Sequence, residues 1–184
     1  MKKMELAVAS NQTAQCAELA AEHDGSLYVD ERDTDGLPFR ALLTLTTDDI
    51  EPLHAIADVG LFVICRRLIK PGKPNKIALF PMVKNAEKTQ AECDTHWRDV
   101  HAPLALIHHE AMTHYTQLSV VHTVSGPAWS GFALCGFETE QDIRENFYTT
   151  KESVRIIADD VMKFATPSAS PRRLIATPKY LAHA

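Results

Sequence analysis

The apolar positions of the first 70 residues follow two periods, and the alternation between them predicts a mixed fold. Short runs that alternate or are rich in β-branched residues indicate strands, whereas apolar residues spaced three and four apart indicate helices. We expect strands at residues 4–10, 26–33, 38–46 and 60–70, and helices at residues 11–23 and 48–57. Turn-forming residues between the second and third strands predict a hairpin. This order, β-α-β-β-α-β, is that of a split ferredoxin-like unit.

The same order returns after a Pro-Gly-Lys-Pro-Asn segment at residues 71–75, which we interpret as a linker. The remaining pattern predicts strands at residues 76–84, 112–123, 130–137 and 172–178, a long helix at residues 89–109, and helices that begin after caps at Thr139 and Thr150. Pro81 argues for an edge position or a bulge in the first of these strands.

These patterns predict an N-terminal half at residues 1–70, the linker, and a C-terminal half at residues 76–184. The predicted fold class is α+β, with two tandem ferredoxin-like units. Their antiparallel sheets can meet edge to edge and close one α+β barrel within the chain, which removes the exposed edges of each half. A monomer and a homodimer are both compatible with this architecture.

The long helix predicted in the C-terminal half carries the most suggestive residues. Thr89 and Glu92 form a capping-box pattern that marks its start. Trp97 and His101 follow one turn apart on its apolar face. Pro103 lacks an N–H group and crowds the preceding turn, so the helix is expected to bend or stop near His101. A titratable ring would then lie beside a freed carbonyl.

Composition narrows the range of partners. The 184 residues, 45% hydrophobic and 23% charged, suit a globular protein with a sizeable core. A net charge of −5 with scattered Lys and Arg residues argues against nucleic acid as a partner. No stretch approaches the ~20 apolar residues of a membrane helix, and the start lacks the apolar region of a signal peptide. The four cysteines lie in apolar patterns and are expected to be buried reduced thiols, which predicts a cytoplasmic protein.

The nine histidines raise the question of a metal site. The candidates are His96, His101, His108, His109 and His114. They form no His-Glu-x-x-His motif, and the neighbours His108 and His109 would point about 100° apart on a helix. We therefore interpret these residues as surface or capping histidines and predict no metal. No phosphate loop or dinucleotide fingerprint is present either, so no cofactor is predicted.

Residues 92–105 read Glu-Cys-Asp-Thr-His-Trp-Arg-Asp-Val-His-Ala-Pro-Leu-Ala. A helix with Trp, then His four residues later, then Ala-Pro-Leu resembles the signature of the EthD domain, a branch of the dimeric α+β barrel superfamily. The resemblance extends over residues 76–178, whereas residues 1–70 are assigned from their own pattern. It implies a pocket between the sheet face and its helices. It also implies relatives that include cofactor-free cyclases, dehydratases, isomerases and monooxygenases, among which the fold does not choose.

Two residues are candidates for catalysis. A neutral His101 could act as a base next to a carbonyl or phenol, and the alternative is that it only bonds the freed carbonyl of the helix. Tyr115 could donate to a developing oxyanion. Trp97 could give an aromatic substrate a flat apolar wall, although core packing is the alternative.

Three further residues are candidates for substrate binding. Gln117 shares one side of its strand with Tyr115, and His122 lies on the other side; the pattern does not decide which side faces the helices. Asp160 could orient a histidine or act as an acid, and the alternative is a solvated carboxylate on an amphipathic helix.

The favoured hypothesis is a cofactor-independent lyase, isomerase or cyclase that moves a proton on a small aromatic or polyketide-like carbonyl compound. One alternative is a non-catalytic protein that binds or shields a small molecule for a neighbouring enzyme. Another is a cofactor-free or haem-dependent monooxygenase.

Overall fold

Two β-α-β-β-α-β units follow one another in the chain, as the hydrophobic pattern predicts. The protein is described by a computed structural model that covers residues 3–181. The first unit comprises β1 (Met4–Ser10), α1 (Thr13–Glu22), β2 (Ser26–Val29), β3 (Ala41–Thr47), α2 (Glu51–Ile56) and β4 (Gly60–Lys70). The second comprises β5 (Lys76–Met82), α3 (Gln90–His96), η1 (Trp97–His101), α4 (Ala102–His108), β6 (His114–Ser125), β7 (Gly131–Phe137), α5 (Glu140–Glu145), α6 (Lys151–Phe164) and β8 (Leu174–Tyr180).

The eight strands close a single antiparallel barrel in the order β1-β3-β2-β8-β5-β7-β6-β4. Two junctions join the units: β2 pairs with β8, and β4 pairs with β6. Each half therefore pairs both edge strands with the other half, so neither sheet leaves a free edge. The predicted fold class, two tandem ferredoxin-like units in one α+β barrel, is confirmed. Residues 71–75 form neither helix nor strand, and the division of the chain into two domains remains a prediction.

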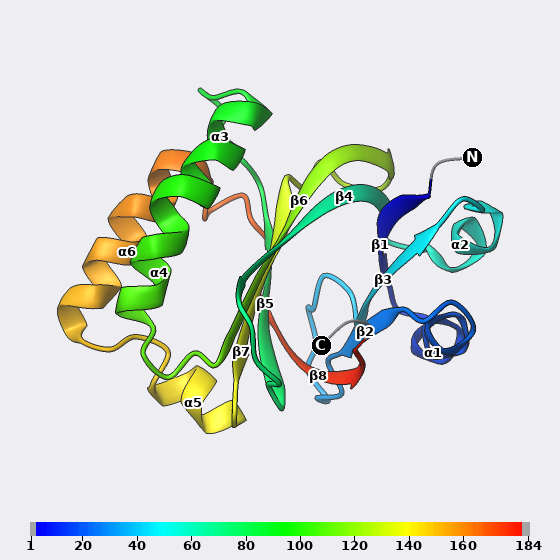
Figure 1. The fold of residues 1–184 in the computed structure, drawn as a ribbon, viewed down its shortest axis with the longest axis horizontal. Coiled ribbons are helices and arrows are strands. Elements are labelled where there is room, and N and C mark those ends of the chain that lie inside the picture. Colours follow the sequence, from blue (N-terminus) through cyan, green and yellow to red (C-terminus); the bar gives the residue numbers. More distant parts are fainter. Residues whose placement is uncertain (1–2, 182–184) are drawn as a thin grey trace.

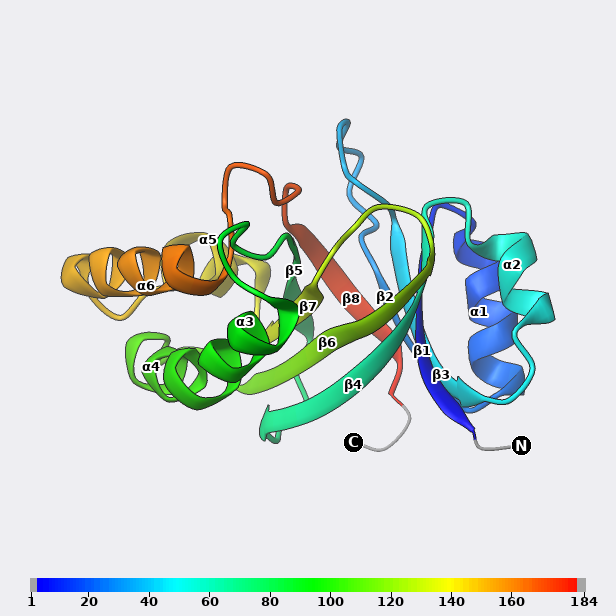
Figure 2. The same cartoon turned by 90° about the horizontal axis from the view of Figure 1, so that it is seen from above.

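The helices form two layers on opposite sides of the barrel (Figure 1). α1 and α2 cover one side, whereas α3, η1, α4 and α6 cover the other, an arrangement also visible from above (Figure 2). Side chains fill the barrel itself: Phe39, Phe62, Trp129 and Phe132 contact one another with ring centroids 5.4 to 6.3 Å apart. A ligand site is therefore to be sought outside the barrel. Within residues 3–181, no helix has the length and apolar character needed to cross a membrane.

Of the two outcomes expected for the long helix near His101, a bend or a stop, the stop is wrong, because the helix continues past this residue. Thr89 and Glu92 form the predicted capping box, and the helix then widens into one π-helical turn, η1, before it continues as α4. In that turn the N–H of Ala102 donates to the carbonyl of Trp97. The wider turn places Pro103 in the first turn of α4, where a helix needs no N–H donor at that position. Such turns occur frequently at functional sites.

Two further expectations need correction. Pro81 lies in a strand that is central rather than at an edge, but β8 pairs with β5 only at Ile77–Leu79. Beyond Leu79, β5 pairs only with β7. On the β8 side, therefore, no strand lies beside Pro81 to need the N–H group that proline lacks.

Cys65 is exposed, whereas the other three cysteines are buried as predicted. Cys65 lies on β4 beyond Val63, where β4 no longer pairs with β1 and pairs only with β6.

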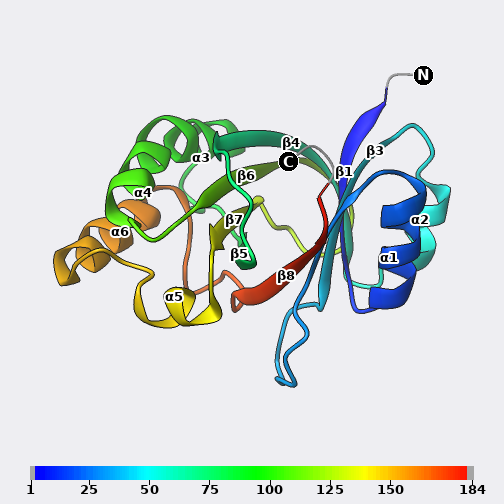
Figure 3. The same cartoon turned by 60° about the horizontal axis from the view of Figure 1, so that its bottom comes forward.

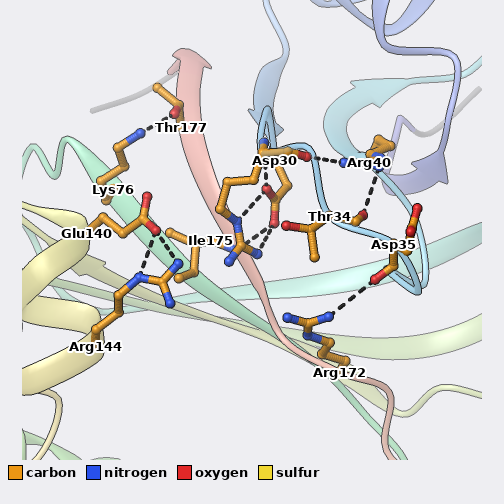
Figure 4. A network of polar contacts seen from close by, with 11 residues as sticks. Asp30, Thr34, Asp35, Arg40, Lys76, Glu140, Arg144, Arg172, Ile175 and Thr177 are labelled. Atoms are coloured by element: carbon orange, nitrogen blue, oxygen red, sulfur yellow. Dashed lines mark hydrogen bonds and ion pairs between the residues drawn. The ribbon is translucent and has the colours of Figure 1, made fainter.

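The strand expected at residues 26–33 ends at Val29, and the chain then forms a loop that projects beyond the barrel (Figure 3). Asp30 organises this loop. Its carboxylate accepts from Arg32 Nε at 2.8 Å and from the backbone N–H of Ile175 on β8 at 2.9 Å (Figure 4). Arg40 donates to the carbonyl of Thr34, and Arg172 donates to the carbonyl of Asp35 (Figure 4). The loop is thereby tied to the second half of the chain.

Candidate functional site

A cavity of about 560 Å³ lies between the C-terminal sheet and its helices. β5, β6 and β7 form its floor, η1, α4 and α6 form its roof, and the segment after α6 closes one side. Most lining side chains are apolar or aromatic. The polar groups are His101, His109, Tyr115, Tyr148, Ser170 and Arg173, together with the thiol of Cys135. A volume of this size and an apolar lining with few polar groups are typical of small-molecule sites.

His101 and Asp160 form a buried pair at the edge of the cavity. His101 Nδ1 lies 3.0 Å from one carboxylate oxygen of Asp160, and His96 Nε2 lies 2.9 Å from the other. Burial alone would raise the pKa of Asp160, but the two imidazoles lower it to about 2. Asp160 is therefore ionised and accepts the Nδ1 proton of His101. That leaves Nε2 of His101 as the basic nitrogen available to the cavity.

The Phe164 ring holds the histidines in place. Its centroid lies 4.9 Å from the His101 ring and 5.5 Å from the His96 ring, and it stacks at 6.4 Å against Trp97. Trp97 and His101, at the two ends of the π-helical turn, are only 3% and 8% exposed. The turn thus keeps both side chains on the cavity side of the helix.

Tyr115 accepts two hydrogen bonds at its hydroxyl oxygen. Trp97 Nε1 donates at 3.0 Å and Gln117 Nε2 at 3.1 Å. Burial raises the pKa of Tyr115 well above its usual value, so the hydroxyl keeps its proton. Because the oxygen is already an acceptor twice, its O–H remains to donate to a ligand in the cavity.

Arg67 on β4 brings the N-terminal half into the site. Arg67 Nε donates to Gln117 Oε1 at 3.1 Å, and its two terminal nitrogens donate to Asp94 at 2.8 and 2.6 Å. The guanidinium also lies 5.6 Å from the Trp97 ring centroid. Gln117 in turn donates to the carbonyl of Trp97 at 2.9 Å. The first half therefore does more than close the barrel, because it supports the wall that contains Trp97.

A second group of polar and aromatic residues gathers around Phe147. His109 Nδ1 donates to the Phe147 carbonyl at 2.6 Å, and its ring lies 5.1 Å from that of Tyr148. Burial lowers the pKa of His109 to about 4, only partly offset by this hydrogen bond. His109 is thus neutral at pH 7. The guanidinium of Arg173 lies over Phe147 and Phe80, 5.5 and 5.8 Å from their centroids.

Nucleophilic catalysis by a cysteine does not suit this cavity. Cys135 lies opposite Tyr115 on the neighbouring strand and lines the cavity. Burial raises the pKa of its thiol to about 12, and the positive charge of Arg173 only partly opposes this. The reactive form of a cysteine is the thiolate, so Cys135 is a packing residue at neutral pH.

The six residues proposed from sequence divide into three groups. Trp97, His101 and Tyr115 line the cavity together. Asp160 and Gln117 lie behind them, 1% and 0% exposed, and position His101 and Tyr115 rather than contact the cavity. His122 does not line the cavity: it is exposed and pairs with Val63 on β4. Of the two faces of β6, the one that carries Tyr115 and Gln117 faces the helices.

Sequence reasoning missed four contributors. Arg67, Tyr148 and Arg173 lie far from the recognised motif in sequence and no local pattern marks them. His109 was expected to be a surface or capping residue, and that is wrong, because residues 146–150 fold over it and bury it. Its neighbour His108 bonds Ser153 through Nδ1 at 3.0 Å. Among the described residues, no three His, Cys, Asp or Glu side chains converge as metal ligands would.

Comparison with known proteins identifies the fold. No model of a protein family matches this sequence, and no curated protein matches it. A solved structure described as an anthrone oxidase-like protein is similar with a TM-score of 0.57 at 9% identity, over 100% of this chain and 97% of that one.

Two further structures are similar. One is a putative monooxygenase from Lactobacillus acidophilus NCFM, with a TM-score of 0.51 at 10% identity over 98% of this chain and 95% of that one. The other is a putative monooxygenase from Fusobacterium nucleatum subsp. nucleatum ATCC 25586, with a TM-score of 0.51 at 10% identity over 97% and 94% of the two chains. At this level of identity the likeness establishes the α+β barrel fold, and the reaction has to be argued from the site.

Proposed function

We propose that this protein removes a proton from an aromatic or polyketide-like carbonyl compound, with His101 as the base, and so catalyses a cofactor-independent cyclisation, dehydration or isomerisation. The observation that carries this proposal is the His101–Asp160 pair at an apolar cavity. Asp160 holds the imidazole through Nδ1 and stabilises the imidazolium that forms when Nε2 takes up a proton. The resemblance of the Trp97–His101 helix to the EthD signature supports a small-molecule pocket at this place.

The proposed step moves one proton and one electron pair. His101 Nε2 takes the proton from a carbon that is next to the substrate carbonyl or conjugated with it through a ring, as the methylene carbon of anthrone is. The electron pair of the broken C–H bond moves toward the carbonyl oxygen to form an enolate. The O–H of Tyr115 donates to that oxygen, because its own oxygen is already engaged by Trp97 and Gln117. Return of the proton at another carbon completes an isomerisation, whereas attack of the enolate on a second carbonyl closes a ring.

A second candidate reaction is a cofactor-free monooxygenation. The similar structures described as monooxygenases and as an anthrone oxidase-like protein favour it. The first step would be the same, since a deprotonated anthrone can reduce dioxygen directly. In that reaction anthrone and one dioxygen give anthraquinone and one water. The two candidate reactions differ only in what the enolate reacts with next: a proton or a second carbonyl group in the first, and dioxygen in the second.

The test uses anthrone as the probe. Under nitrogen in deuterated buffer, NMR measures how fast its methylene hydrogens exchange with solvent. We expect the wild-type protein to accelerate exchange, and His101→Ala to reduce the acceleration by about 100-fold or more, because positioned acid-base groups contribute that much. Asp160→Asn should reduce it at least tenfold, since the neutral amide no longer fixes the imidazole. In air, oxygen uptake with anthraquinone formation would favour the monooxygenase.

Matched controls are His54→Ala and Asp159→Asn. His54 is exposed on α2 at the opposite side of the barrel, and Asp159 is the exposed neighbour of Asp160. Neither change should alter exchange. A folded His101→Ala protein with the full exchange rate would remove His101 from the mechanism. Binding of anthrone without acceleration by the wild-type protein would contradict the enzyme and favour a binding or shielding role.

A further inference from the structure

Arg173 borders the cavity and has no carboxylate partner in the described part of the chain. It lies just before β8, with its guanidinium over the rings of Phe80 and Phe147. Its one hydrogen bond among the described residues is a long one, from Nη2 to the carbonyl of Ile143 at 3.5 Å. No Asp or Glu of residues 3–181 forms an ion pair with it. Its planar donor fork therefore has unused N–H groups beside the cavity.

The charges around Arg173 do not compensate for it. The charged side chains that influence its pKa are two other arginines, Arg144 and Arg32. Each of these has its own carboxylate: Arg144 Nε donates to Glu140 at 2.8 Å (Figure 4), and Arg32 Nε donates to Asp30 at 2.8 Å. Burial, opposed in part by Tyr148, and the charge of Arg144 lower the pKa of Arg173. The guanidinium nevertheless stays protonated at neutral pH.

A partly buried cation without a partner is unfavourable, and an anion at this position would relieve the cost. The aromatic rings around the guanidinium also restrict what that anion can be. Phe80, Phe147 and Tyr148 line the same part of the cavity as Arg173 and offer flat apolar contacts to a ligand. A free inorganic ion would leave these surfaces unfilled, whereas an aromatic acid would cover them and pair with the fork.

We propose that the compound bound in this cavity is an aromatic or polyketide-like acid whose carboxylate pairs with Arg173. The inference rests on the proposed function, because it assumes that the same cavity holds the substrate on which His101 acts. It makes Arg173 a specificity-determining residue. The carboxylate is held by Arg173 while the acidic C–H group is presented to His101, so one end of the substrate is anchored and the other reacts.

The test compares two probes of the same shape, 2-naphthoate and its neutral analogue 2-naphthamide, by isothermal titration calorimetry at pH 7. We expect the wild-type protein to bind the naphthoate at least about tenfold more tightly, since its carboxylate accepts charge-assisted hydrogen bonds from the guanidinium that the amide cannot match. Arg173→Met should abolish this preference. Arg173→Lys should keep part of it, because the charge remains but the bidentate fork is lost.

The control is Arg172→Met, since Arg172 is the exposed neighbour and donates only to the loop carbonyl of Asp35. It should keep the wild-type preference. Equal binding of the two probes by the wild-type protein, or a preference that survives Arg173→Met, would overturn the inference. Both results leave the anthrone exchange test, and hence the role of His101, unaffected. Failure of the wild-type protein to bind either naphthalene would overturn the aromatic ligand and the inference with it.

Discussion

His109 illustrates how burial sets the protonation state of a cavity residue. Its Nδ1 proton is used by the Phe147 carbonyl, and burial lowers its pKa from 6.5 to about 4. In the unfolded chain the same imidazole would bind a proton near pH 6.5. Between these values the unfolded state binds more protons than the folded state, so stability rises with pH. This contribution is complete above pH 6.5 and is lost as the pH falls toward 4.

We predict that His109→Asn removes this pH dependence while keeping a donor for the Phe147 carbonyl. Urea unfolding at pH 7 and pH 4.5 should show the wild-type protein losing about 2 kcal/mol more stability than the variant, at roughly 1.4 kcal/mol for each unit of pKa shift. Parallel curves for the two proteins would contradict the assignment of a buried neutral imidazole. The exposed His54 provides the control, because His54→Asn should leave the wild-type pH dependence unchanged.

At the scale of elements, the π-helical turn packs closely against strand β7 at Gly131. The space there is too small for a Cβ atom. A Cβ atom there would lie 2.7 Å from Cζ3 of Trp97 and 2.9 Å from the carbonyl oxygen of Leu118. Trp97 also donates to Tyr115, and its carbonyl accepts from Gln117. The ring is therefore held from several sides, and it cannot yield without disturbing the cavity wall.

We predict that Gly131→Ala lowers the free energy of unfolding by about 1–3 kcal/mol through overpacking and shifts the fluorescence of Trp97. Combining it with Trp97→Phe should restore part of the stability relative to Trp97→Phe alone, because phenylalanine lacks the indole atoms nearest the new methyl group. Chemical denaturation of the four proteins in this cycle measures the coupling. Additive losses would show that the Trp97 ring does not press on β7.

At the scale of the whole molecule, the two halves are joined by strand pairing and by Asp30. Asp30 is 2% exposed and bonds both Arg32 and the backbone of Ile175 across the β2–β8 junction. Burial would raise the pKa of Asp30, but these hydrogen bonds lower it, so the carboxylate stays ionised at neutral pH. Because both junctions lie within one chain, closure of the barrel does not require a dimer.

We predict that Asp30→Ala lowers the free energy of unfolding by about 2 kcal/mol, since it leaves the Ile175 N–H buried without a partner. Asp35→Ala is the control, because Asp35 is exposed and only its backbone carbonyl is used, by Arg172. The control should stay within about 0.5 kcal/mol of wild type. Equal stability of both variants in urea unfolding would mean that Asp30 adds nothing to the strand pairing at the β2–β8 junction.

Local sequence signals anticipated most of the elements and part of the site. The strand at Gly60–Lys70 and the capping boxes at Thr89 and Thr139 form where the pattern predicts them, because caps and apolar periods act over a few residues. Trp97, His101 and Tyr115 were recognised from a helix motif and a strand. His122 was misplaced because strand alternation tells which residues share a face, but not how far along the strand the helix layer extends.

The sequence alone determined the order of the elements, their approximate limits and the apolar face that carries Trp97 and His101, since these depend on periodicity and on neighbours in the chain. Only the tertiary structure decided that Asp160 meets His101, that Arg67 from the first half supports the cavity wall, and that Arg173 borders the cavity without a counterion among residues 3–181. The contacts of Arg67 and His101 join residues 50 and 59 positions apart in the sequence. The position of Arg173 likewise depends on which distant residues pack around it. They follow from barrel closure and helix packing, which no local pattern encodes.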